Sequence, residues 1–158
     1  MLETRLTQDL RTTVDLIVRD LRRAGYWGHA GAGANPYAFT AAAAPSDTVS
    51  LRYSIDAAEN DIADSTEQFG FRLRGGAIEA QLGAGNWQAL TDPGSLTVNA
   101  FSVTPEVQEI SLAPACTQQQ RDVTVVVSAA LASDARITRT VRTRVRVRSN
   151  TLVGTCPF

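Results

Sequence analysis

The feature that most constrains the fold is a helical period of apolar residues over residues 1–28. One side of the helical wheel collects Leu6, Leu10, Val14, Ile17, Leu21 and Ala24. Most charged residues of this stretch lie outside that stripe, as in a helix that is solvated on one side only. Gly25 can adopt the left-handed conformation that commonly ends a helix. We therefore predict an amphipathic helix over residues 1–25 that needs a broad apolar surface to lie against.

The rest of the chain alternates apolar and polar residues in short runs, which is typical of half-buried strands. Residues 28–45 are rich in glycine, alanine and proline and have no such period, which predicts a long connection. The predicted strands cover residues 49–55, 69–73, 78–82, 87–90, 96–101, 107–112, 123–131 and 137–147. We therefore predict an α+β fold, in which the N-terminal amphipathic helix packs on a mostly antiparallel β-sheet head of about eight to ten strands.

The length of 158 residues is sufficient to bury a core and favours one domain. We predict that residues 1–25 form the helix, residues 26–47 cross from helix to sheet, and residues 48–158 form the sheet head of a single domain. Apolar residues make up 44% and charged residues 20% of the chain, which is typical of a globular protein. A formal net charge of −1 provides no overall attraction to nucleic acids or anionic membranes.

The two cysteines, Cys116 and Cys156, lack the spacing of a metal site. They are either partners in a disulfide or two separate buried thiols. Cys156 lies close to the end of the chain, where a strand frays unless it is tied down. A bridge would close a loop of about 41 residues and would stabilise the fold by about 4 kcal/mol through loop-closure entropy. It would also imply an oxidising compartment such as the periplasm or the cell exterior.

Arginine alternates with smaller residues near the C-terminus, at Arg142, Arg144, Arg146 and Arg148. On a strand these side chains project from one face at intervals of about 6.6–6.8 Å. Such a ladder can bind phosphates or align with carboxylates of a partner protein. Alternatively, it is a solvated sheet face whose charges are balanced by neighbouring acids. The sequence leaves open a solvated face, a protein partner, and DNA or another polyanion.

Carboxylates gather between two predicted strands, at Asp56, Glu59, Asp61 and Asp64. Calcium prefers oxygen ligands, but the spacing lacks the alternation and the glycine of an EF-hand loop. The alternative is a solvated acidic loop. We assign no metal site and leave calcium binding at residues 56–64 open.

The aromatic residues around the predicted crossing, Tyr26, Trp27, Tyr37 and Phe39, also allow two interpretations. They either close the core beneath a loop or form an exposed docking surface. Asp20, at the edge of the apolar stripe, is either a solvated acid or a partner for an arginine or for backbone amides of the sheet.

No constellation for catalysis is visible in the sequence. His29 is the only histidine, and it lies in a glycine-alanine segment. The glycine-rich run at residues 28–33 follows a predicted helix, whereas a dinucleotide-binding loop follows a strand. We expect no enzymatic activity, no cofactor and no small-molecule substrate.

Residues 5–28, RLTQDLRTTVDLIVRDLRRAGYWG, resemble the region after the membrane segment in minor pilins of type IV pili, especially those of the PilW type. The run at residues 19–28 is the most specific part, and Arg148-Ser149-Asn150 resembles the end of a long strand in such proteins. The resemblance implies that residues 1–25 are the C-terminal half of the pilin α1 helix. It also implies a hydrophobic N-terminal helix, missing from this chain, that anchors the protein in the inner membrane. Pilins tie their C-terminal region with a disulfide, and Cys116 and Cys156 match that habit.

The resemblance implies a structural minor pilin that takes part in priming type IV pilus assembly and sits at the pilus tip. Its expected partners are other minor pilins and the major pilin, with roles in twitching motility and cell adhesion. It is expected to face the periplasm from the inner membrane before assembly and to reach the cell surface in the pilus. One alternative is a J-type pseudopilin of a type II secretion pseudopilus. Another is a tip adhesin module that binds DNA or a host ligand.

Overall fold

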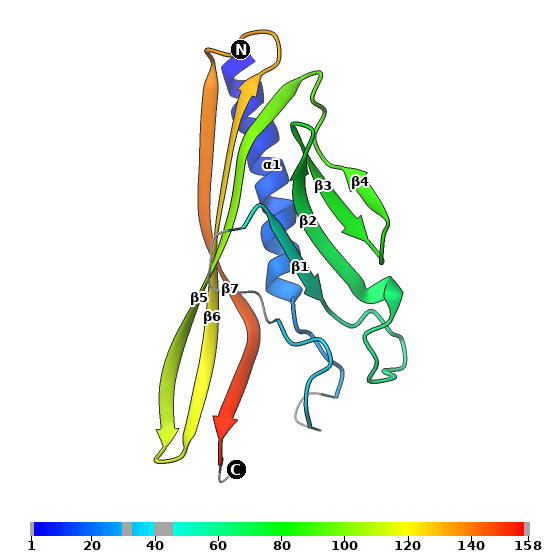
Figure 1. Cartoon of the computed structure of the whole chain (residues 1–158), viewed down its shortest axis with the longest axis vertical. Helices are drawn as coiled ribbons and strands as arrows, with labels where there is room; N and C mark the ends of the chain where they lie inside the picture. Colours follow the sequence, from blue (N-terminus) through cyan, green and yellow to red (C-terminus); the bar gives the residue numbers. More distant parts are fainter. Residues whose placement is uncertain (1, 30–32, 40–45, 157–158) are drawn as a thin grey trace.

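The computed structural model describes residues 2–29, 33–39 and 46–156, and only the backbone at 148–151. A single α-helix, a short 3₁₀ helix and seven strands are found in these ranges (Figure 1). In chain order they are α1 (Leu2–Arg23), β1 (Thr48–Arg52), η1 (Ser65–Glu67), β2 (Gln68–Arg74), β3 (Ala77–Leu82), β4 (Trp87–Ala89), β5 (Leu96–Ala113), β6 (Cys116–Leu131) and β7 (Thr138–Gly154).

Helix α1 buries the predicted apolar stripe. Leu10, Ile17 and Leu21 are 0% exposed, and Leu6 is 1% exposed. The helix ends where Gly25 adopts a φ of 83°, a conformation that costs little only for glycine. Among the described residues, no helix is both long and apolar enough to cross a membrane.

The strands form two antiparallel sheets, which overturns the predicted fold class. One sheet has the order β1-β2-β3-β4 and the other has the order β5-β6-β7. The fold is therefore β-rich with one N-terminal helix, and the predicted α+β arrangement of a helix on one sheet head is wrong. Alternation of apolar residues reports which face of a strand is buried, but it does not report which strands pair.

Strand β5 runs through the point where a break was predicted. Residues 96–101 and 107–112 were expected to be separate strands because Thr104-Pro105 lies between them. Val103 exchanges both backbone hydrogen bonds with Ser46, so its N–H and C=O groups point away from β6. Pro105 is two residues further along and points the same way, so its missing N–H removes no bond to β6. Proline is therefore tolerated in this edge strand.

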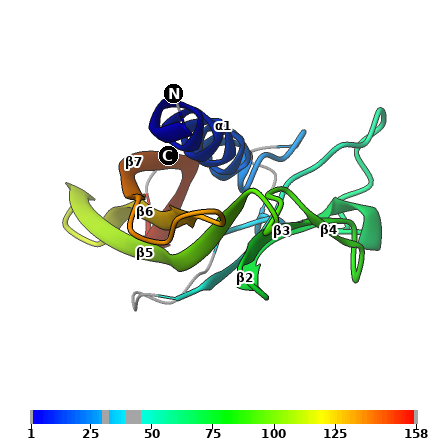
Figure 2. The ribbon, with the colours of Figure 1, turned by 90° about the horizontal axis from the view of Figure 1, so that it is seen from above.

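The core lies where α1 covers one face of β6 and β7 (Figure 2). Val123, Val125 and Val127 of β6 and Val147 of β7 are 0% exposed. The second sheet adds Leu51, Phe71 and Ile78 to the same apolar cluster. The helix thus completes a core that both sheets share, and the second sheet also packs directly on β5.

The β5-β6-β7 sheet continues well past the C-terminal end of α1 (Figure 1). We call this distal part, residues 106–120 and 152–156, the arm. Val107, Ile110, Leu112, Leu152 and Val153 are 40–49% exposed there. In the described ranges the arm is held by strand pairing, by a backbone hydrogen bond at its tip and by a disulfide described below.

We expect Leu10→Ala to lower the free energy of unfolding by about 2–5 kcal/mol, because it leaves a cavity between α1 and the sheets. Leu2→Ala makes the same chemical change on the same helix at a side chain that is 56% exposed, and it should have an effect below about 0.5 kcal/mol. Urea unfolding followed by circular dichroism measures both. Equal effects of the two substitutions would contradict the packing described here.

Candidate interaction surfaces

The arginine ladder lies on the outer face of β7. Arg142, Arg144 and Arg146 are exposed, whereas Val145 and Val147 between them are buried on the helix side. This alternation follows from the two-residue period of a strand. The backbone of Arg148 belongs to β7, but its side chain lies outside the described residues.

Acids of the same sheet balance two of these arginines. Arg144 Nη2 lies 2.8 Å from Asp122 Oδ2 and 3.1 Å from Glu106 Oε2, and Arg146 Nε lies 3.1 Å from Asp122 Oδ1. The hydrogen bonds from Arg146 and Arg144 hold the pKa of Asp122 below its usual range, although burial opposes them. Within the described part of the chain, Arg142 makes no ion pair or side-chain hydrogen bond. Binding of DNA or of a protein partner by this ladder stays a prediction.

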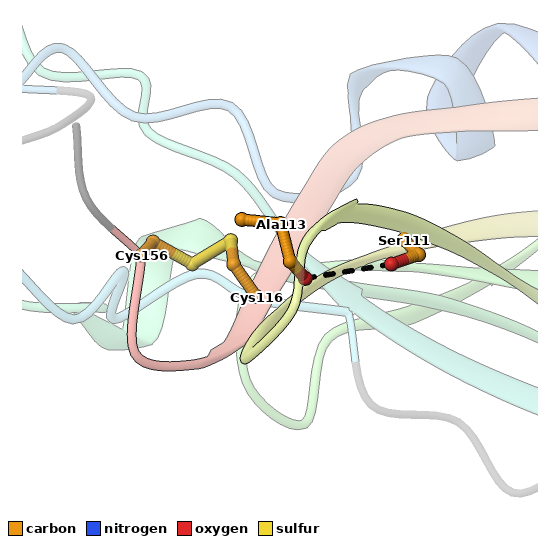
Figure 3. Close-up of a disulfide and its surroundings, with 4 residues drawn as sticks. All are labelled: Ser111, Ala113, Cys116 and Cys156. Atoms are coloured by element: carbon orange, nitrogen blue, oxygen red, sulfur yellow. Dashed lines mark hydrogen bonds between the residues drawn. A yellow bond between two sulfur atoms is a disulfide. The ribbon is translucent and has the colours of Figure 1, made fainter.

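A disulfide closes the tip of the arm, as the sequence predicts (Figure 3). It joins Cys116, the first residue of β6, to Cys156 just beyond β7, with the two Cα atoms 4.8 Å apart. Thr155 N also donates to the Ala115 carbonyl at 2.7 Å. Gly154 has a φ of 92°, and a Cβ atom there would clash with the same carbonyl. The end of β7 is therefore held against the β5–β6 turn.

The acidic loop at residues 56–64 is held against the segment that follows α1, and does not simply stand in solvent. We call these contacts, together with those of Glu67, the clamp. Glu59 accepts hydrogen bonds from Gly28 N at 3.1 Å and from the Tyr37 hydroxyl at 2.9 Å. Asp61 accepts from Trp27 Nε1 at 2.7 Å, and the same oxygen lies 2.7 Å from His29 Nδ1. Two of the predicted carboxylates thus hold the loop against the segment that follows α1.

Glu67 is the central residue of this clamp, and sequence reasoning missed it. Its side chain is 0% exposed and accepts from Ile55 N, Asp64 N and the Tyr37 hydroxyl, each at 3.0 Å. Burial raises the pKa of Glu67, but the two backbone N–H groups and Tyr37 outweigh it and hold the pKa below its usual value. The spacing Asp64-x-x-Glu67 is that of a capping box and was the available signal.

The same loop brings three carboxylates together. Oxygens of Asp56, Asp64 and Glu67 lie within 4.8 Å of one another. The Asp56 Oδ2 atom is buried and has no hydrogen-bond partner among the described residues, and burial raises the pKa of this carboxyl. Both Glu67 oxygens already accept hydrogen bonds, so the arrangement serves the clamp. Calcium binding in this loop stays a prediction, and Asp56 and Asp64 are better placed to coordinate the ion than Glu59 and Asp61.

Most of the predicted aromatic cluster closes the core. Trp27, Tyr37 and Phe39 are buried, whereas Tyr26 is 59% exposed. Asp20 is also buried, with its Oδ1 atom 3.6 Å from Arg19 Nε. Burial raises the pKa of Asp20, and Arg19 and Arg23 act against it.

A pocket lies at the C-terminal end of α1, with a volume of about 340 Å³. It is lined by Arg23, Tyr26, Tyr53, Ser54 and Ile55. The Arg23 guanidinium lies 5.6 Å from the centre of the Tyr53 ring, and that ring stacks on Phe69. We call this the helix-end pocket; it combines an exposed cation with exposed apolar side chains.

Comparison with known families gives these surfaces a context. Residues 1–147 match the family of prepilin peptidase-dependent protein B, PpdB. The chain belongs to this family. The comparisons find no match among curated proteins or solved structures. This PpdB-family chain is therefore a type IV pilus-related protein, as the resemblance predicted, while the assignment to the PilW type stays a prediction.

In this PpdB-family chain, we expect Asp122→Asn to lower the free energy of unfolding by about 1.5–3 kcal/mol, because two arginines lose a charged acceptor. Asp134→Asn is the matched control, since its pair with Arg136 lies at the surface, where ion pairs contribute little to stability. Urea unfolding at neutral pH measures both. An Asp122→Asn effect no larger than that of the control would contradict the proposed balance of charge.

For Glu67 the prediction concerns pH. A carboxyl whose pKa is lowered in the folded state stabilises the fold above its unfolded pKa of about 4.3, and this contribution is lost as the pH falls through the folded pKa. Glu67→Gln should therefore reduce the free energy of unfolding by about 1.5–3 kcal/mol above that range and by progressively less below it.

Unfolding of the PpdB-family chain and of Glu67→Gln between neutral pH and about pH 2.5 tests this expectation. The pKa of the Asp56 carboxyl is raised by burial and by the Glu67 charge, so Glu67→Gln also changes the contribution of Asp56. The comparison is therefore made with Asp56→Asn present in both proteins. A difference that stays constant with pH would rule out a charged Glu67 as the clamp.

Proposed function

We propose that this chain is a structural minor pilin of the PilW type, which takes part in priming type IV pilus assembly and sits at the pilus tip. The observation that carries the proposal is the match of residues 1–147 to the PpdB family, whose description names dependence on prepilin peptidase. A substrate of that peptidase is expected to carry a leader and a hydrophobic helix ahead of residue 1. The protein then faces the periplasm from the inner membrane and reaches the cell surface within the pilus.

The arrangement of surfaces supports a structural role. Helix α1 presents its charged side to the exterior, and the arm carries exposed apolar residues that a partner subunit can cover. Two of the three described ladder arginines are balanced within the sheet, which favours protein partners over DNA. The expected partners are other minor pilins and the major pilin, and we expect no catalytic activity.

Deletion of the gene tests the proposal. We expect surface pili, counted by electron microscopy and in sheared fractions, to be lost, and exoprotein secretion to continue. Expression of the full-length protein should restore the pili, and a form whose prepilin peptidase cleavage site is changed should not. Intact pili with lost exoprotein secretion would instead identify a J-type pseudopilin. Intact pili with lost DNA uptake or adherence would identify a binding module.

A further inference from the structure

The surroundings of β7 change where its sheet passes the end of α1 (Figure 1). Before that point its inner side chains are buried, with Val145 3% and Val147 0% exposed. In the arm, Leu152 and Val153 of the same strand are 49% and 46% exposed. Among the described side chains of the arm, Cys116 alone is buried. Apolar burial therefore contributes little to holding the end of β7 in place.

The pairing of β7 with β6 is also interrupted there. Arg121 pairs with Val147 and Gln119 with Thr151, so the single residue between them on β6 faces three residues of β7. Such a bulge disrupts the ladder locally and bends the strand that carries the extra residues. Beyond it, β7 pairs with β6 at residues 151–154. Strand β5, by contrast, pairs with β6 without interruption on both sides of this point.

Two contacts at the tip of the arm close this short paired segment. Thr155 N donates to the Ala115 carbonyl at 2.7 Å, and the disulfide joins Cys156 to Cys116. The segment is thereby fixed at both ends, by the core at Val147 and by a covalent bond at Cys156. While the bridge is intact, an opened segment stays part of a closed loop, so opening releases little chain entropy. Without the bridge, the segment is no longer tied to β6 at its far end and opening releases more.

We propose that the end of β7 opens as a unit separate from the core, with the bulge as its hinge and the Cys116–Cys156 bridge as its latch. In the oxidised protein, residues 151–156 complete the arm as its third strand. When the bridge is reduced, these residues leave β6 and the arm keeps two strands, while the core around α1 stays folded. The oxidation state of one cysteine pair thus sets the shape of the arm. This switch does not depend on the pilin role proposed above.

Reduction proceeds by thiol–disulfide exchange with a dithiol. Cys156 is partly exposed whereas Cys116 is buried, so a thiolate of the dithiol attacks the Cys156 sulfur and the Cys116 thiolate leaves. The second thiolate of the dithiol then attacks the dithiol's own sulfur in the mixed disulfide and releases Cys156. The protein S–S bond is broken, two electrons and two protons pass to the cysteines, and the dithiol becomes a disulfide.

Hydrogen–deuterium exchange measured by mass spectrometry, with and without dithiothreitol, tests the switch. The chain contains two cysteines, so the reagent has no other disulfide within the chain to reduce. After reduction we expect the amides of residues 151–156 to exchange about tenfold faster or more, and those of residues 123–131 and 141–147 to keep their protection. The variant Cys116→Ala/Cys156→Ala should exchange like the reduced protein with or without dithiothreitol, which controls for direct effects of the reagent.

Deletion of Ser149 and Asn150 tests the hinge. It leaves one residue of β7 opposite Gln120 and, because the side-chain period of a strand is two, it preserves the register of residues 151–154. The ladder of this variant is continuous, so reduction should accelerate exchange at residues 151–156 less than it does in the wild type. Circular dichroism melting checks that each variant folds.

Three results would overturn the proposal. Unchanged exchange at residues 151–156 after reduction of the wild type would show that the bridge is no latch. Protection lost at residues 141–147 as well would show that the bridge holds the whole fold and that the arm does not open separately. An equal effect of reduction in the folded deletion variant and in the wild type would show that the bulge is no hinge.

Discussion

Burial of the apolar stripe of α1 is the interaction on which the rest of the structure depends. The helix lies against the valines of β6 and β7, and its apolar residues share one cluster with the second sheet. That sheet also packs on β5, where Val98 N donates to the Gly76 carbonyl at 2.9 Å beside the bridge between Ser46 and Val103. Apolar burial is non-directional, so one helix can serve two sheets at once. Without it, each sheet would expose an apolar face to water.

Hydrogen bonds and the disulfide then hold the loops and the arm, which the apolar core does not fix in place. Glu59 and Glu67 accept hydrogen bonds from the helix-to-sheet segment and from the loop before β2. Their carboxylates therefore hold these two irregular segments together. Backbone donors in loops need such acceptors when they are shielded from water. At the other end of the molecule, the disulfide between Cys116 and Cys156 holds the strands of the arm together at its tip. Both ends of the molecule are thereby held by interactions between segments that are distant in the chain.

Local patterns predicted the elements better than their assembly. The helix with its buried stripe, the strands at residues 69–73 and 78–82, and the cysteine pair appear as expected. Each depends on near neighbours or on a single possible pairing. The strand break at Pro105 was wrong because tolerance of proline depends on which side of the strand is free, and this is set by the distant Ser46. Glu67 was missed because two of its donors, Tyr37 and Ile55, lie far from it in the chain.

The sequence by itself determined that residues 2–23 form a one-sided helix, that alternating strands follow, and that arginines share one face of the last strand, because periodicity fixes which side chains lie together on one element. Only the tertiary structure decided that the strands divide into two sheets. It also decided that Asp122 and Glu106 balance Arg144, and that the acidic loop clamps the crossing segment instead of standing in solvent. These outcomes rest on pairings between distant segments, and periodicity within one segment carries no information about its partner.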